Sequence, residues 1–147
     1  MPRPVRGIAG STLEQAYRQA IYRIDGHPPR DLVLDGFKPV PGATTGSNAE
    51  GIFITACNPR SRRLRPSVNA RRLRALQRAV QWMGYTCLAA RALDPQGLWP
   101  EEPSFWVPRL PLARGHELAR RFGQNAFVAC DARGVARLMW VVRRPVP

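Results

Sequence analysis

Several residue types that catalytic and metal sites commonly use are scarce in this chain of 147 residues. Its three cysteines are widely spaced and form no C-x-x-C pair, so the sequence predicts neither a disulfide framework nor a zinc site. The two histidines, His27 and His116, lie far apart, and no glycine motif of the standard dinucleotide or phosphate-loop type is present. We therefore expect no cofactor and no metal.

Long apolar runs are also missing. The longest uncharged stretch, residues 79–90, is too short to cross a bilayer and contains Gln81 and Thr86. The basic N-terminal residues 1–7 are not followed by the apolar stretch of a secretory signal. Hydrophobic residues make up 44% of the chain, which is a globular composition at the length of one domain. The sequence predicts a reduced, cytoplasmic protein with no membrane partner.

Acidic residues are few, 10 against 23 Lys and Arg, and the net charge is +13. Such a charge attracts polyanions and accelerates their encounter with the protein. Lys38 is the only lysine, however, and the abundance of Arg, Ala, Gly and Pro also fits the codon usage of a GC-rich genome. The charge can therefore be functional or a compositional bias.

The basic residues gather in one part of the chain, because no acidic residue occurs between Gly51 and Leu93. A loop and a helix face this basic can grip phosphates, so we expect nucleic acid as one possible partner. The alternative is a solvated helix face. The nucleic-acid candidates are Arg60, Arg62, Arg63, Arg65, Arg71, Arg74 and Arg78.

Hydrophobic periodicity predicts a single α+β domain: one mixed sheet with about three helices packed on it, a β-α-β unit and a C-terminal β-hairpin. We expect a flexible leader over residues 1–10, the domain over 11–142 with a mobile loop at 36–50, and a frayed tail at 143–147. A first helix is predicted to begin at a capping box at Ser11, and two further helices are predicted over residues 68–83 and 112–122. The predicted strands are residues 21–25, 32–34, 51–57, 85–92, 105–110, 126–130 and 135–142.

The helix over residues 68–83 is predicted to be amphipathic. Arg71, Arg74 and Arg78 share one face at 100° per residue, and the apolar residues that include Leu76 and Val80 share the opposite face. Ser67 is expected to cap this helix and Gly84 to end it. The four tryptophans are scattered along the chain, and we expect them in the core or at its rim.

Five polar residues are candidates for a ligand cleft. Asn58 follows the strand 51–57 and Asn69 begins the next helix, so both can lie at the carboxyl end of that strand, where α/β sheets bind ligands. Glu102 could act as a general base, or hold a ligand hydroxyl or a metal. Ser104 and Gln124 could bind ligand polar groups. The structural alternatives are amides that satisfy loop backbone groups and a Glu102 that pairs with an arginine.

Three stretches carry a resemblance to a known bacterial family. They are Phe53-Ile-Thr-Ala-Cys-Asn-Pro59 followed by Asn69, Trp99-Pro-Glu-Glu-Pro-Ser-Phe105, and Phe122-Gly-Gln-Asn-Ala126, with Ala16-Tyr-Arg18 and Tyr22 upstream. In this order and spacing the chain resembles the proteins classed as domain of unknown function 3293. That family has no established activity, so the resemblance implies a shared fold and site. The chain departs from the family pattern at Cys57, where an aromatic residue is usual, and at Val68, where an acidic residue is common.

The leading functional hypothesis is binding of a small polar or anionic ligand in a cleft lined by Asn58, Asn69, Glu102, Ser104 and Gln124, and turnover of that ligand stays open. The first alternative is nucleic-acid binding through residues 60–78, and the second is a protein-interaction module with an exposed apolar patch. No sequence feature decides whether the protein is an enzyme.

Overall fold

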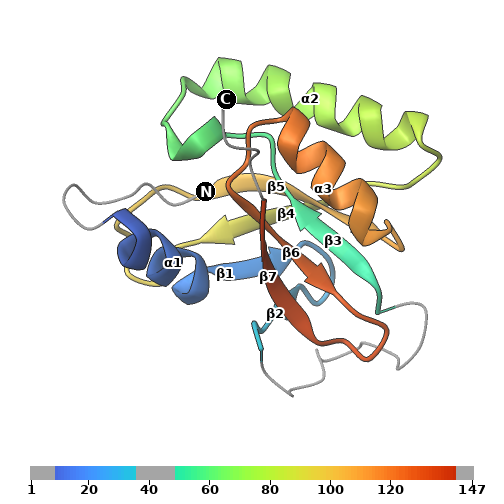
Figure 1. The fold of residues 1–147 in the computed structure, drawn as a ribbon, viewed down its shortest axis with the longest axis horizontal. Helices are drawn as coiled ribbons and strands as arrows, with labels where there is room; N and C mark the ends of the chain where they lie inside the picture. Colours follow the sequence, from blue (N-terminus) through green and yellow to red (C-terminus); the bar gives the residue numbers. More distant parts are fainter. Residues whose placement is uncertain (1–8, 36–48, 142–147) are drawn as a thin grey trace, which may run out of the picture.

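The computed structural model describes residues 9–35 and 49–141, which form three α-helices and seven strands (Figure 1). The helices are α1 (Ala9–Gln19), α2 (Pro66–Trp82) and α3 (Leu112–Arg121). The strands are β1 (Ile21–Ile24), β2 (Arg30–Leu32), β3 (Gly51–Ile54), β4 (Leu88–Leu93), β5 (Glu102–Pro108), β6 (Ala126–Cys130) and β7 (Ala136–Trp140). None of the described helices has the length and apolar character that a membrane span requires.

Parts of the predicted organisation lie outside the described residues: the leader up to residue 8, the loop from 36 to 48 and the tail from 142. Residues 9 and 10 of the predicted leader belong to α1, so Ser11 lies inside this helix and not at its cap. The remaining helices and strands agree with the predicted order along the chain, with ends displaced by a few residues.

The seven strands form one sheet in the order β2-β1-β4-β5-β3-β6-β7. The α+β class and the β6–β7 hairpin are confirmed, but a mixed sheet was expected and every ladder between these strands is antiparallel. The reason is the position of β5, which inserts between β3 and β4. Because both strands run antiparallel to β5, they share one direction, and β3–α2–β4 is a split β-α-β unit.

The sheet curls until its two edges approach each other. Leu34, just beyond β2, forms a parallel bridge with Ala136 of β7, and the Asp35 N–H donates to the Ala136 carbonyl at 2.8 Å. Successive strand residues point to opposite faces, so the curl has a concave inside and a convex outside. The inside is filled by a cluster that includes Tyr22, Ile24, Phe53, Ala92, Trp106 and Val128.

The convex face packs against α2 and α3, which lie together on one side of the sheet in Figure 1. Leu76 and Val80 of α2 and Leu118 of α3 are buried there against outward side chains of β3, β5 and β6. Since β3 has the concave cluster on one face and the helices on the other, all four of its residues are buried, as predicted for a central strand.

Helix α2 starts at Pro66 and not at the predicted cap Ser67. A proline at the first helical position has no N–H to satisfy and a φ already suited to the helix, so no side-chain cap is needed. At the other end Gly84 adopts a φ of 89°, and the Tyr85 N–H returns to the Val80 carbonyl. Gly84 therefore ends the helix as predicted, because glycine tolerates this left-handed conformation.

Candidate functional site

The chain leaves β3 through a loop that carries the first candidate residue, Asn58. Three residues of this loop have left-handed backbone conformations: Asn58 with φ 49°, Arg60 with φ 55° and Ser61 with φ 58°. Such conformations cost free energy in residues other than glycine, and asparagine accepts them better than most. The loop therefore needs hydrogen bonds from its surroundings to hold this shape.

Asn69, in the first turn of α2, supplies one side of that support. The Asn58 backbone N–H donates to Asn69 Oδ1 at 3.0 Å, and Asn69 Nδ2 donates to Asn58 Oδ1 at 2.9 Å. Asn58 Oδ1 also accepts from the Leu64 N–H at 2.9 Å, and Asn69 Nδ2 also reaches the Leu64 carbonyl at 3.4 Å. The two amides thus fasten the loop to the helix.

Glu102, the first residue of β5, contacts the same amide cluster. Asn58 Nδ2 donates to Glu102 Oε2 at 2.9 Å, and the glutamate is only 2% exposed. A buried carboxylate is costly unless hydrogen bonds compensate it, so Asn58 contributes to its stability there. The next inward residue of the strand, Ser104, is buried and donates to the Glu102 carbonyl at 3.2 Å.

The segment 122–125 supports the loop from the other side. Gln124, 2% exposed, uses Nε2 to donate to the Cys57 carbonyl at 3.0 Å and to the Phe122 carbonyl at 3.3 Å. The Arg60 N–H donates to the Gly123 carbonyl at 2.7 Å, and Asn125 Nδ2 donates to Ser61 Oγ at 3.0 Å. The three stretches that carry the family resemblance therefore meet around one loop.

A pocket of about 330 Å³ opens beside this cluster. We call it the Glu102 pocket. It is lined by Cys57, Asn58, Arg63, Leu64, Pro66, Asn69, Ala70, Leu73, Pro100, Glu101, Glu102 and Pro103. Of the five predicted ligand residues, Asn58, Asn69 and Glu102 line this pocket. Ser104, one inward position further along β5 than Glu102, and Gln124, bonded to loop carbonyls, do not.

Arg63 is the lining residue whose place sequence reasoning missed. It was grouped with the nucleic-acid candidates because it lies in a basic run, and its position in the Glu102 pocket depends on the left-handed turns after Asn58. No local sequence signal specifies those turns, since two of the three left-handed residues are Arg60 and Ser61.

Cys57 lies at the pocket but is not suited to nucleophilic chemistry. Its side chain is buried, and Sγ donates to the Pro103 carbonyl at 3.6 Å. Burial raises the pKa of the Cys57 thiol, so the neutral thiol prevails at neutral pH. No group of three or more His, Cys, Asp or Glu side chains in the described ranges is arranged to hold a metal ion.

The seven nucleic-acid candidates are all exposed, on the loop before α2 and on the outer side of that helix. Within residues 9–35 and 49–141, none of them pairs with an acidic side chain. Arg72 differs from its neighbours because it turns inward: Nε donates to the Ala56 carbonyl at 2.7 Å, and Nη2 donates to the Phe122 carbonyl. Arg72 is therefore a structural residue.

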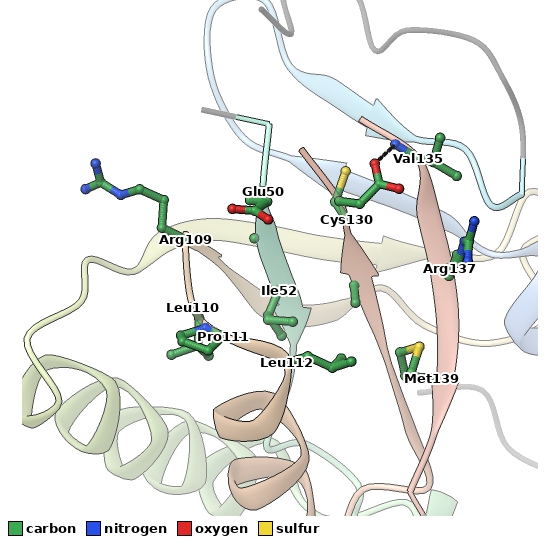
Figure 2. Close-up of a pocket in the computed structure, with 13 residues that line it drawn as sticks. Glu50, Ile52, Arg109, Leu110, Pro111, Leu112, Cys130, Val135, Arg137 and Met139 are labelled. Carbon is green, nitrogen blue, oxygen red and sulfur yellow. Dashed lines mark hydrogen bonds between the residues drawn. The ribbon is translucent and has the colours of Figure 1, made fainter. Parts of the chain in front are cut away.

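A second pocket, of about 490 Å³, lies away from the predicted site, beside the β6–β7 hairpin (Figure 2). We call it the hairpin pocket. Ile52, Leu112 and Met139 contribute apolar side chains, while Arg109 and Arg137 stand on opposite sides of it. Asp131, which also lines it, accepts hydrogen bonds from the backbone N–H groups of the following turn. Burial opposes ionisation of this carboxyl, but those N–H donors prevail and lower the pKa of Asp131.

Fold and site together define a small α+β protein in which a curled antiparallel sheet carries a pocket with apolar walls and a few polar side chains beyond the carboxyl end of β3. The model of the family described as "Protein of unknown function (DUF3293)" matches residues 54–127, half of the chain, and the chain belongs to this family. The matched segment contains every residue that lines the Glu102 pocket, but only residues 109–112 of the hairpin pocket. No curated protein and no solved structure matches the chain.

Proposed function

We propose that the Glu102 pocket binds a small polar ligand that carries both a cationic or N–H donor group and an anionic group. The observation that carries this proposal is the buried carboxylate of Glu102 in the wall of a pocket of about 330 Å³. Pockets for small molecules typically measure about 300–1,000 Å³ and combine apolar walls with a few polar groups. Leu64, Leu73 and Pro103 supply apolar wall here.

The charges that line the pocket narrow the ligand class. Three charged side chains line the pocket, those of Arg63, Glu101 and Glu102. Glu101 pairs with Arg91, and the amides of Asn58 and Asn69 hold the loop, so we assign ligand recognition to Glu102 and Arg63. The Glu102 carboxylate would repel a simple anion, and the Arg63 guanidinium would repel a simple cation. A zwitterion such as a free amino acid satisfies both, with its ammonium toward Glu102 and its carboxylate toward Arg63.

The test is a ligand-observed NMR screen of the free amino acids, with inorganic phosphate as the simple-anion probe. We expect at least one amino acid to bind the wild-type protein, and Glu102→Gln and Arg63→Ala to abolish that binding. Glu117→Gln and Arg62→Ala are the matched controls, because they make the same substitutions at exposed residues outside the pocket. Both variants should bind the amino acid as the wild type does. Absence of amino-acid binding, or phosphate binding that Glu102→Gln leaves unchanged, would contradict the proposal.

We also propose that the protein works in a reducing, cytoplasmic compartment. Cys57, Cys87 and Cys130 all remain free thiols in the fold, and none is needed to stabilise it by cross-linking. Disulfides are rare in the cytosol, which supports this location. Fractionation of cells that make the protein tests it, and recovery outside the cytosolic fraction would contradict it.

A further inference from the structure

Trp82, the last residue of α2, is 92% exposed, and this contradicts the expectation that the tryptophans lie in the core or at its rim. Trp106, by contrast, is 2% exposed inside the curled sheet. An indole carries a large apolar surface that proteins usually cover in part. A fully displayed tryptophan therefore raises the question of what it contacts.

Trp82 lies in line with three of the nucleic-acid candidates. At 100° per residue, Arg71, Arg74, Arg78 and Trp82 fall within about 80° of one another around the helix axis. We call these four residues the α2 stripe. All four are exposed, and the stripe lies opposite Leu76 and Val80, which face the sheet. Helix α2 runs along one side of the molecule in Figure 1, and the exposure of the four side chains makes the stripe accessible among the described residues.

The arginines of the α2 stripe have no acidic partner among the described side chains, and the chain has no acidic residue from Gly51 to Leu93. The helical rise of 1.5 Å per residue places Arg71 and Arg78 roughly 10 Å apart along the axis, with Trp82 about 6 Å further. The stripe is thus an extended row of cations that ends in an aromatic ring.

We propose that the α2 stripe binds single-stranded nucleic acid, with the three arginines on phosphates and Trp82 stacked on a base. Proteins that bind single strands combine a basic path along the backbone with aromatic side chains that stack on bases, whatever the base sequence. The exposed arginines of the preceding loop, Arg60, Arg62 and Arg65, extend the basic path beyond the N-terminal end of α2. This surface is separate from the amino-acid site proposed above.

The geometry favours a single strand over other anionic partners. A duplex keeps its bases stacked on each other, so the indole would have no base face to cover. A lipid surface requires a broad apolar helix face, whereas the apolar face of α2 is buried and Trp82 is its only exposed large hydrophobic residue. An acidic peptide would engage the arginines but would leave the indole without a specific role.

The first experiment titrates dye-labelled oligo(dT) and oligo(U) with the protein and records the anisotropy of the label together with tryptophan fluorescence. Because the chain has four tryptophans, the difference in quenching between the wild type and Trp82→Phe gives the part that comes from Trp82. We expect quenching on binding, and Trp82→Ala should weaken affinity by about 5- to 150-fold, the range for one stacked base. Trp82→Phe retains a stacking ring and should keep most of the affinity. Leu98→Ala, at a side chain that is 79% exposed and outside α2, should have no effect.

The second experiment tests the arginines against a control of equal charge. The triple change of Arg71, Arg74 and Arg78 to Gln should lower the slope of log affinity against log salt by about 2, since each phosphate contact on a single strand contributes about 0.7. A triple change of Arg120, Arg133 and Arg137 to Gln, all exposed elsewhere, should change it little. Glu102→Gln should bind oligonucleotides normally, which separates this surface from the amino-acid site.

Three results would overturn the proposal. They are equal losses in the two triple variants, unchanged affinity in Trp82→Ala, and binding of a duplex or of anionic vesicles that is as tight as binding of the single strand. The first result would mean that the net charge of +13 acts non-specifically, and the others would assign the stripe to a different partner or to none.

Discussion

Asn58 and Asn69 exchange hydrogen bonds in both directions between the end of β3 and the start of α2. The Asn58 N–H donates to Asn69 Oδ1, and Asn69 Nδ2 donates back to Asn58 Oδ1. Asn58 has a left-handed backbone conformation, so this pair holds the loop in a shape that it would not adopt alone. The same pair turns Asn58 Nδ2 toward Glu102, and it therefore couples the loop to the pocket.

This exchange predicts that Asn69 is needed for stability as well as for the pocket. Asn69→Ala removes an acceptor and a donor at once and should lower the free energy of unfolding by about 1–3 kcal/mol, measured by urea denaturation. Asn69→Asp keeps the acceptor for the Asn58 N–H, but it places an oxygen instead of the donor nitrogen against Asn58 Oδ1 and the Leu64 carbonyl. Its loss of stability should therefore be comparable to that of Asn69→Ala.

A double-mutant cycle of Asn69→Ala with Asn58→Ala measures the interaction energy between the two side chains apart from the individual effect of each change on stability. We expect the double variant to lose at least about 0.5 kcal/mol less than the sum of the single losses, because either single change already breaks the bond from Asn69 Nδ2 to Asn58 Oδ1. The bond from the Asn58 backbone N–H to Asn69 Oδ1 survives in Asn58→Ala and is lost only when Asn69 changes. Additive losses would show that the two amides act independently, in contradiction to the geometry.

Arg72 and Arg71 are neighbours in sequence with opposite roles, and they form a matched pair for mutation. Arg72 bridges the Ala56 and Phe122 carbonyls, so Arg72→Ala should reduce the free energy of unfolding by about 2–4 kcal/mol. Arg72→Lys should recover little, since an ammonium cannot reproduce the planar fork. Arg71→Ala, at an exposed site, should stay within about 0.5 kcal/mol of the wild type. Equal effects at 71 and 72 would rule out the structural role.

Gln124 is predicted to be a structural residue because its side-chain amide donates to two carbonyls of the chain. Gln124→Glu has nearly the same shape but replaces the donor nitrogen with an oxygen that faces the Cys57 and Phe122 carbonyls. We expect Gln124→Ala to lower the free energy of unfolding by about 1–3 kcal/mol and Gln124→Glu to lower it further. Thermal unfolding of the two variants tests this order, and the reverse order would contradict it.

Sequence periodicity predicted the helices and strands well where each element has one apolar face. The apolar faces of α2 and α3 and the apolar run of β3 agree with the structure because burial alone specifies them. The expected mixed sheet was wrong because pairing depends on a long-range event, the insertion of β5 between β3 and β4. No local pattern encodes that choice of neighbours.

Only part of the candidate site could be predicted, because its residues also depend on long-range neighbours. Asn58, Asn69 and Glu102 line one pocket, as their positions at the end of β3, the start of α2 and the start of β5 allow. Ser104 lies on the same face of β5 as Glu102 but one inward position further along the strand, and Gln124 is bonded to loop carbonyls, so neither lines the pocket. The exposure of Trp82 was missed because the composition of a helix does not reveal that this side chain points away from the sheet and remains 92% exposed.

Gly51 is required by the Trp106 ring. A Cβ at Gly51 would overlap atoms of the indole, which fills the concave side of the sheet and has no room to move. Gly51→Ala should therefore destabilise the protein by about 1–3 kcal/mol or more, as overpacking of a core does. Gly26→Ala is the control, because its Cβ would meet only the Pro28 carbonyl oxygen at 3.4 Å. Similar unfolding free energies for the two variants would contradict this packing.

The buried thiol of Cys130 predicts a loss of stability at alkaline pH. Burial, and then the nearby Asp131 carboxylate, raise the pKa of Cys130 to about 11 from an ordinary value of 9.0. The unfolded chain thus releases this proton at a lower pH than the folded chain does. The free energy of unfolding should be level below about pH 9 and should decrease as the pH rises toward 11.

Comparison with Cys130→Ala isolates this contribution, because burial also raises the pKa of Cys57, Cys87 and Tyr22 and all three add to the alkaline loss. The variant keeps those three groups but has no thiol at residue 130, so its unfolding free energy should decrease less steeply above about pH 9. Urea denaturation of both proteins across this range gives the difference. Parallel curves would show that the Cys130 thiol titrates alike in the folded and unfolded chains, and that the β6–β7 hairpin does not shield it from water.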